Sequence, residues 1–215
     1  MTNHTARMAA LLGELRREMN GAVAESMQRG EGGYGLNYGV SIPTIRAIAG
    51  RVGTDHAFAR FLYRQDVREL RMAAPTIADP ASVTPDNVDE WFVGRMPEEL
   101  IEELALRLLS RCGRPVLDTL CGRWLRAGSG AERYAALMAL ARARVQEFDA
   151  AGVVEAVPDA VAACPDDLRL ARGAAAFVQS ASARIAPERL ARMIERLPDS
   201  RGGAYLRDEL AWMIL

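Results

Sequence analysis

"DVRELRMAAPTIA", residues 66–78, is the stretch of sequence that decides the fold class. It carries arginine or glutamate early, here Arg68 and Glu69, and continues with small and branched apolar residues. Three later segments repeat this pattern at roughly the helix-pair period of solenoid repeats: "EELALRLLSRC" (102–112), "AERYAALMALARAR" (131–144) and "DLRLARGAAAFVQ" (167–179). In such an array each helix pair buries its apolar face against its neighbours, and the second helices line a concave groove. The sequence therefore predicts an all-α protein, an α-solenoid of about five or six antiparallel helix pairs that forms one domain over residues 1–215.

Helical periodicity continues through the rest of the chain, and no segment alternates apolar and polar residues for long enough to predict a strand. One face of a first helix is predicted to carry Met8, Leu12, Leu15, Met19 and Ala22. Capping residues and prolines predict further helix starts, at Ser41 with Pro43, Thr54, Thr84-Pro85-Asp86, Pro97-Glu98-Glu99, Pro115, Pro165, Pro187 and Ser200.

The composition excludes several classes of protein. Of the 215 residues 50% are hydrophobic and 26% charged, and the net charge is −1, so no overall field directs the chain to nucleic acid or to an anionic membrane. No stretch reaches the roughly 18 apolar residues of a membrane span, and the N-terminus lacks a signal-peptide profile. We expect a cytoplasmic protein with no membrane partner. Because the chain contains no lysine, each basic site apart from histidine is a planar arginine fork suited to carboxylate or phosphate.

Cysteine and histidine are too few for the common metal and catalytic sites. Cys112, Cys121 and Cys164 are an odd number without a CxxC pair, which predicts unpaired thiols in helices. With only His4 and His56, histidine-based triads and multi-histidine metal sites are excluded. No phosphate-binding loop or dinucleotide fingerprint is present. We therefore expect neither a metal nor a cofactor.

The loop "YGLNYGVSIPTIRAIAG", residues 34–50, interrupts this helical pattern. We expect it to join the N-terminal helix to the repeats, with Gly39 permitting a close approach and with Ser41 and Pro43 starting the next helix. Tyr34 and Tyr38 are candidates for stacking on a base or sugar. For Tyr38 the alternative is that its side chain packs the loop against the first helix.

The stretches "NYGVSIPTIRAIAGRV" and "FLYRQDVRELRMAA" resemble the DNA alkylation repair family of HEAT-like repeat proteins. That family has an aromatic-Gly-(Val/Ile)-x-x-Pro-x-(Leu/Arg)-Arg element followed by an acidic "RE" helix. The resemblance is specific at residues 38–51 and 66–74, covers residues from about 10 to 180, and is nearest to an uncharacterised bacterial branch. It implies a HEAT-like, armadillo-type superhelix and the chemistry of an alkylpurine DNA glycosylase, in which a carboxylate stabilises an oxocarbenium-like transition state.

The resemblance also implies where the site residues would lie. The family's Trp-x-x-x-Asp pair corresponds to Glu98 and Glu102, and its later tryptophan to Ala176, so Glu102 is the candidate catalytic carboxylate. Trp91 and Trp124 stand at other helical positions. Aromatic stacking on a cationic purine contributes about 0.5–2 kcal/mol, and a catalytic carboxylate displaced by about 1 Å can lose a hundredfold in rate. The departures therefore argue against an unaltered glycosylase.

The remaining candidates concern binding. By helical rotation Glu98 and Glu102 border the apolar face, whereas Glu99 and Glu103 are predicted to lie on the surface. Arginines from successive repeats could form a stripe that binds phosphates, although each one alone could be a surface ion-pair partner. They are Arg46, Arg51, Arg68, Arg71, Arg107, Arg111, Arg142 and Arg144.

Two hypotheses of function follow from these candidates. The first is a non-catalytic solenoid that binds duplex DNA, or alternatively a protein, in its concave groove. In the DNA case Tyr34, Tyr38, Arg46, Arg68, Arg71, Arg107 and Arg111 are the nucleic-acid-binding residues. The second is an alkylpurine DNA glycosylase with altered site residues.

Overall fold

The computed structural model describes residues 3–29, 33–92, 94, 96–145 and 147–213. Within these residues the regular secondary structure is helical, apart from one isolated β-bridge between Leu36 and Val67. The predicted all-α class is confirmed. The α-helices are α1 (His4–Arg17), α2 (Gly21–Arg29), α3 (Ile42–Val52), α4 (His56–Tyr63), α5 (Arg68–Ile77), α6 (Glu98–Arg107), α7 (Arg114–Thr119), α8 (Leu125–Ala127), α9 (Gly130–Leu140), α10 (Ala150–Ala163), α11 (Leu168–Ala181), α12 (Pro187–Glu195) and α13 (Arg201–Leu210).

Short helices of other types connect them. A π-helical turn, Leu120–Trp124, joins α7 to α8. The 3₁₀ turns are Pro80–Ser82, Val88–Trp91, Leu109–Arg111, Ser182–Arg184 and Ala211–Met213.

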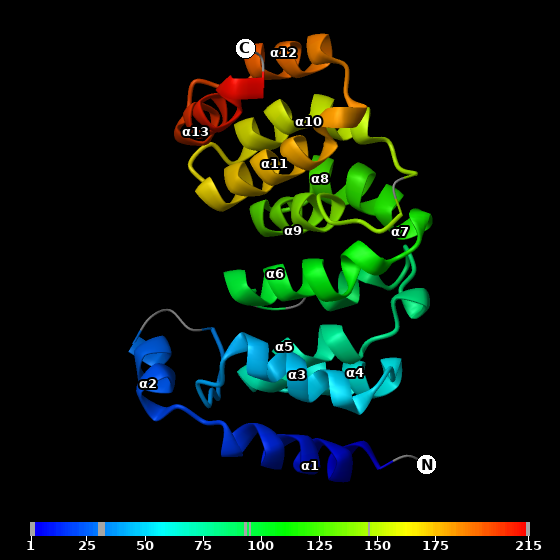
Figure 1. Cartoon of the computed structure of the whole chain (residues 1–215), viewed down its shortest axis with the longest axis vertical. Helices are drawn as coiled ribbons and strands as arrows, with labels where there is room; N and C mark the ends of the chain where they lie inside the picture. The colour runs from blue at the N-terminus through cyan, green and yellow to red at the C-terminus, as the bar shows by residue number, and fades with distance from the viewer. Residues whose placement is uncertain (1–2, 30–32, 93, 95, 146, 214–215) are drawn as a thin grey trace. The chain divides into compact units, whose positions relative to one another are not determined.

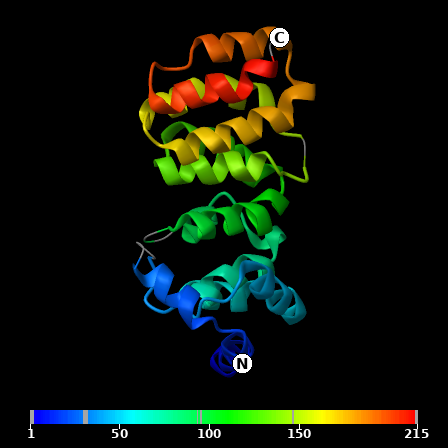
Figure 2. The same cartoon turned by 60° about the vertical axis from the view of Figure 1, so that its left-hand side comes forward.

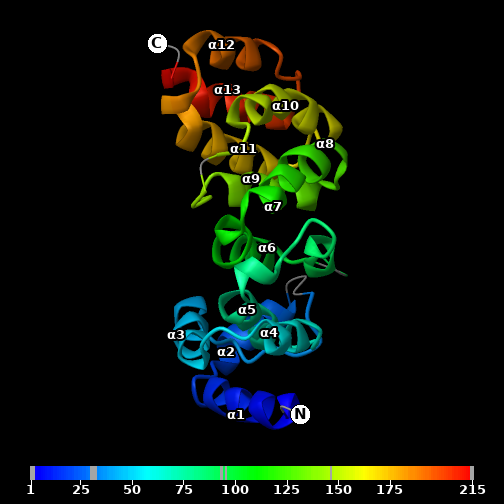
Figure 3. The ribbon, with the colours of Figure 1, turned by 90° about the vertical axis from the view of Figure 1, so that its right-hand side faces the viewer.

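The chain divides into two compact units. The first comprises residues 1–82 and 89–108 and contains α1 to α6; the second comprises residues 83–88 and 109–215 and contains α7 to α13. In the first unit α5 packs against α3, α4 and α6 (Figure 3). In the second unit α11 packs against both α9 and α13, and α10 packs against α12 (Figures 1 and 2).

Helix α5 is the central helix of the first unit. All of its residues except Thr76 are buried, including Arg68, Glu69 and Arg71. A helix that is buried on every side normally lacks charged residues, because burying a charge without a partner is costly. The charged residues of α5 must therefore be paired inside the protein, and their partners define the site described below.

Several predicted helix starts are confirmed. Ser41 caps α3 by accepting a hydrogen bond from the Thr44 N–H at 3.3 Å, and Ser200 caps α13 in the same way. Helix α6 begins at Glu98, directly after Pro97, as predicted. Helix α12 begins at Pro187.

Other predicted starts are wrong. Asp55, not Thr54, caps α4, because its carboxylate reaches the Phe58 N–H at 3.0 Å. The segment at Thr84-Pro85-Asp86 forms a turn that leads into the 3₁₀ turn Val88–Trp91 instead of an α-helix.

The predicted face of the first helix is confirmed only in part, since Leu15 is buried and Met8 and Leu12 are half-buried but Met19 and Ala22 lie beyond the helix. Helix α1 ends at Arg17 and buries Leu11 and Leu15, whereas Met19 is 57% exposed. The chain leaves the helix here because the Asn20 side chain accepts a hydrogen bond from the Val23 N–H at the start of α2.

The cysteines agree with the prediction of unpaired thiols. Cys112 is buried, Cys121 and Cys164 are half-buried, and no disulfide joins any two of these three described residues. Among the described residues, no helix combines the length and apolar character needed to cross a membrane.

Candidate functional site

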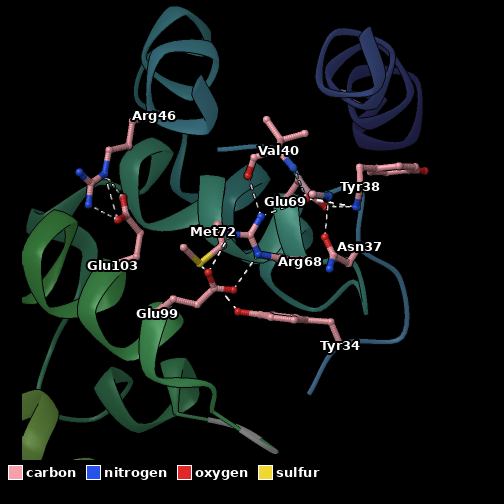
Figure 4. Close-up of polar contacts among 11 residues, drawn as sticks. Tyr34, Asn37, Tyr38, Val40, Arg46, Arg68, Glu69, Met72, Glu99 and Glu103 are labelled. Atoms are coloured by element: carbon pink, nitrogen blue, oxygen red, sulfur yellow. Dashed lines mark hydrogen bonds and ion pairs between the residues drawn. The ribbon is translucent and has the colours of Figure 1, made fainter. Parts of the chain in front are cut away.

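Arg68 and Glu69, the residues that open α5, form the centre of a buried polar network. Arg68 is 3% exposed and Glu69 is 0% exposed. Arg68 donates from Nε and from Nη2 to the two carboxylate oxygens of Glu99 on α6, at 2.7 Å each (Figure 4). A guanidinium fork and a carboxylate match in this bidentate arrangement, which is stronger than a single neutral hydrogen bond. The pair therefore fixes the start of α5 to the start of α6.

The same two residues hold the loop that precedes α3. Glu69 accepts hydrogen bonds from the backbone N–H groups of Tyr38, at 3.1 and 3.2 Å, and of Val40, at 3.2 Å. Arg68 donates from Nη1 to the Val40 carbonyl at 2.8 Å. Buried backbone groups outside a helix need such partners, since an unmet hydrogen bond in the interior is costly. The "NYGV" and "RE" stretches, on which the family resemblance depends, thus meet in one internal contact.

Gly39 lies between these two backbone contacts. Its φ is +69°, and a Cβ atom there would lie 2.3 Å from the Asn20 carbonyl oxygen and 2.7 Å from the Ala24 nitrogen. Asn20 donates its backbone N–H to the Tyr38 carbonyl at 2.9 Å. The close approach predicted at Gly39 is confirmed, and it joins the loop to the start of α2.

Tyr34 faces the same network. Its hydroxyl forms a hydrogen bond with Glu99 and lies 3.8 Å from the Met72 sulfur (Figure 4). Burial of the phenol, together with the negative charge of Glu99, raises the pKa of Tyr34 well above its usual value. The hydroxyl therefore stays protonated and donates to the carboxylate, so Tyr34 is a partner of Glu99 within the protein.

Arg71, one turn further along α5, is also buried at 7% exposure. Its guanidinium lies 5.8 Å from the ring centre of Tyr34 and 5.4 Å from that of Tyr63, within the range of a cation–π contact. Its Nη2 lies 3.6 Å from the Met96 sulfur. Arg68 and Arg71 are therefore both enclosed by residues of the protein itself, whereas a phosphate contact needs an accessible guanidinium.

Glu103 organises a second cluster on α6. Arg46 of α3 donates to it from Nε, at 3.0 Å, and from Nη2, at 2.6 Å, and the Arg107 Nε lies 3.4 Å from it. The hydrogen bond to Glu103 is the main reason that the pKa of Arg46 is raised. The side chains of Arg46 and Arg107 remain 31% and 37% exposed, so both are partly accessible, although the Nε atom of Arg107 is buried.

The structure corrects the prediction that Glu99 in the first network and Glu103 in this cluster lie on the surface. Glu103 is 2% exposed, and the Glu99 side chain is 21% exposed. They lie inward because each meets an arginine from an earlier helix, which the rotation of α6 alone does not reveal.

None of the three residues at the positions of the family's two tryptophans and aspartate supplies an aromatic wall. Glu98 is half-buried, Glu102 is exposed, and Ala176 is half-buried on α11 in the second unit. Trp91 and Trp124 are 0% and 1% exposed. Neither tryptophan presents a face to a ligand, so neither replaces the missing aromatic walls.

The remaining candidates lie apart from the buried network. The Tyr38 ring is half-buried and lies 5.8 Å from the Arg16 guanidinium at the end of α1. Arg111 is half-buried in the second unit, in the 3₁₀ turn Leu109–Arg111. No group of three or more histidine, cysteine or acidic side chains among the described residues is placed to bind a metal.

Sequence reasoning missed Glu69, Glu99 and Glu103 as partners of the arginines. One signal was available, because a charged pair within an otherwise apolar helix such as "RELRMAAPTIA" must be neutralised by residues from elsewhere in the chain. The sequence does not say which residues those are.

Comparison with known proteins gives one informative likeness. No protein-family model and no curated protein matches the sequence. A solved structure described as a new family of proteins related to the HEAT-like repeat DNA glycosylases, with affinity for branched DNA structures, superposes with a TM-score of 0.69. The match has 16% sequence identity and covers 96% of this chain and 95% of that one. The chain therefore has the fold of the HEAT-like repeat proteins, as the resemblance of its loop and "RE" helix implied.

Proposed function

We propose that this protein binds DNA without efficient base excision. The observation that carries the proposal is the likeness in fold over 96% of the chain to proteins described as having affinity for branched DNA structures. A fold shared at 16% identity can serve several functions, so the proposal also depends on the side chains of this protein. We further propose that it acts in the cytoplasm.

The side chains favour binding over excision. Excision of an alkylated purine by the chemistry of the related glycosylases needs aromatic faces for the cationic base and a precisely held carboxylate. Here Trp91 and Trp124 are buried, and the exposed Glu102 stands in place of the aspartate. Retained glycosylase activity is the alternative, with Glu102 as its carboxylate.

The arginines divide into two roles under this proposal. Arg46, Arg107 and Arg111 are proposed to contact DNA phosphates, because each is partly accessible and a guanidinium binds phosphate through paired N–H groups. Tyr38 is proposed to contact a sugar or base. Arg68, Arg71 and Tyr34 are proposed to support the loop and the start of α6.

The test is binding to labelled duplex DNA, a four-way junction and single-stranded DNA over a series of salt concentrations. Each phosphate contact contributes a slope of about −0.9 in log K against log salt for duplex DNA. We expect tighter binding to the junction than to the duplex, and we expect Arg107→Gln to flatten the slope by about one contact. The matched control is Arg114→Gln, which removes an exposed arginine that lies outside the candidate stripe and pairs with Asp118 at 3.4 Å.

Two outcomes would overturn the proposal. Absence of salt-dependent binding to all three DNA forms would favour a protein as the partner. Rapid release of purine from methylated duplex DNA would restore the glycosylase.

A further inference from the structure

Helix α12 in the second unit and Arg196, the residue that caps its C-terminal end, present three arginines on one face. Arg189, Arg192 and Arg196 follow the spacing i, i+3, i+7, which places them within about 60° of one another around the helix axis. Together with Glu155 of α10 and with Met193 they line a cavity of about 260 Å³. Among the described residues the polar side chains that line this cavity are therefore those of the three arginines and Glu155.

Two of these arginines are held in place by α10. Arg189 donates from Nη1 to the Glu155 carboxylate at 2.9 Å. Arg196 donates from Nη2 to Asp159 at 3.2 Å and from Nη1 to the Glu155 carbonyl at 3.2 Å. Each guanidinium has five N–H donors, so these contacts orient both groups and leave donors available to a ligand.

Arg192 lies between them in sequence and differs from both. All three are exposed, but among the described residues the Arg192 guanidinium makes no hydrogen bond or ion pair, and the backbone carbonyl of Arg192 accepts a hydrogen bond from the Arg196 N–H at 3.2 Å. Glu188 and Glu195 lie four residues before it and three after it on the same helix, and both are exposed, but neither pairs with it in the described structure. An uncompensated guanidinium beside two oriented ones is the arrangement that a multiply charged anion favours.

The chemistry of the cavity selects a phosphate. Glu155 pairs with Arg189 and Asp159 pairs with Arg196, so three guanidinium groups against two carboxylates leave one positive charge, and arginine binds phosphate oxygens through paired N–H donors. None of the described residues that line the cavity is aromatic, so none of them offers a face on which a base could stack.

We propose that the cavity between α10 and α12 is a phosphate-binding subsite, and that its ligand is a backbone phosphate of the bound DNA. The source of the phosphate rests on the proposed function, whereas the preference for phosphate does not. A small molecule with a phosphate or pyrophosphate group offers the same chemistry, and the test below separates the two sources.

The first arm measures binding of the full chain to the four-way junction over a salt series. We expect Arg192→Gln to weaken binding about three- to tenfold near 0.1 M salt and to lower the slope by about 0.9. The control is Arg201→Gln on α13, which removes another exposed arginine of the same unit and should leave both quantities unchanged. Glu155→Gln should tighten binding or leave it unaltered, because it removes the one carboxylate from the lining.

The second arm uses inorganic pyrophosphate, measured by calorimetry on the same proteins with sulfate as a competitor. We expect weak binding by the wild type and by Arg201→Gln, and loss of binding in Arg192→Gln. If DNA binds and Arg192→Gln behaves like Arg201→Gln in both arms, the subsite is overturned and the proposed function stands. If DNA does not bind but pyrophosphate does, in an Arg192-dependent manner, the proposed function and the DNA source fail and the phosphate site stands. If neither ligand binds, both proposals are overturned.

Discussion

Arg68 holds Glu99 through two parallel hydrogen bonds, Nε to Oε1 and Nη2 to Oε2, each 2.7 Å long. The two residues are 31 positions apart in the chain and open two successive helices of the first unit. Their side chains are 4% and 21% exposed, so the pair is largely removed from water. Removing one partner of such a pair leaves a buried charge without compensation, which costs about 3–5 kcal/mol.

The first prediction follows from this geometry. Arg68→Lys keeps the charge but loses the planar fork, so Glu99, Glu69 and the Val40 carbonyl cannot all be satisfied. We expect the free energy of unfolding to fall by about 2–4 kcal/mol in urea denaturation.

The control for this prediction is Arg51→Lys. Arg51 pairs with Glu14 at 2.6 Å, but the two side chains are 62% and 45% exposed. An exposed pair contributes only about 0–1 kcal/mol, so this variant should unfold almost as the wild type does. If both variants lost the same small amount of unfolding free energy, the Arg68–Glu99 pair would not stabilise the packing of α5 against α6.

The second prediction concerns Gly39. Gly39→Ala introduces a Cβ atom 2.3 Å from the Asn20 carbonyl oxygen at a φ of +69°, so both backbone strain and a backbone clash oppose it. Gly53→Ala is the matched variant, because Gly53 has a φ of +80° and no atom within 4 Å of the added Cβ. With its ψ of −179°, Gly53 lies in a region that glycine alone readily adopts, so we expect Gly53→Ala to cost about 1–3 kcal/mol from strain alone and Gly39→Ala clearly more. The comparison is made by thermal unfolding, and equal losses would contradict the close packing of the loop on α2.

The helices could be predicted from the sequence, but the pairing of their charges could not. Apolar periodicity predicts α6 correctly from Glu98, since helical burial depends on residues close together in the chain. The same pattern assigns charged residues to the surface and therefore misplaced Glu103. Its burial depends on Arg46, which lies 57 positions away. Only the tertiary structure brings such partners together.

The predicted cap of α4 is also wrong, because the cap depends on a contact between residues far apart in the chain. Thr54 and Asp55 are both good capping residues, so local preference does not separate them. Asp55 also receives a hydrogen bond from Arg7 of α1 at 2.6 Å, a contact that depends on the packing of two helices.

That contact gives the third prediction. The hydrogen bond from Arg7, followed by that from the Phe58 N–H, lowers the pKa of Asp55 below its usual value. A lowered carboxyl pKa stabilises the folded state above the unfolded pKa of about 3.9, and this stabilisation is lost as the pH falls through the folded pKa. Asp55→Asn keeps a capping side chain but removes the charge. We expect it to be about 0.5–1 kcal/mol less stable than the wild type at pH 7, and we expect the gap to close in strong acid.

Arg7→Gln provides the check on this mechanism. It removes the largest cause of the lowered Asp55 pKa and leaves the Phe58 contact. We therefore expect Arg7→Gln also to be less stable than the wild type at pH 7, and we expect this difference in the free energy of unfolding to become smaller as the pH falls. Urea unfolding at a series of pH values measures both variants. A gap that stays constant from pH 7 to pH 2 would show that the charge of Asp55 has no part in it.

The fourth prediction concerns Cys121. Burial, and then the negative charge of Asp118, raise the pKa of its thiol to about 12. Because the thiolate is the reactive form, we expect Cys121 to resist alkylation by iodoacetamide at pH 8 in the native protein and to react readily in urea. Peptide mapping by mass spectrometry measures the rate at this residue. Rapid native alkylation would show that the thiol is more accessible to solvent than the structure indicates.

The last prediction tests the chemistry at Glu102. We expect the protein to release almost no purine from methylated duplex DNA, because the faces of Trp91 and Trp124 are buried and cannot stack on a cationic base. Glu102→Gln should leave DNA binding intact or tighten it slightly, since it removes an exposed negative charge. Released base is measured by chromatography beside an alkylpurine glycosylase of known activity, and binding is measured on the same DNA. Glu98→Gln serves as the matched control, because it neutralises another glutamate on the first turn of α6. Robust release that Glu102→Gln abolishes and Glu98→Gln preserves would make Glu102 the catalytic carboxylate and the protein a glycosylase.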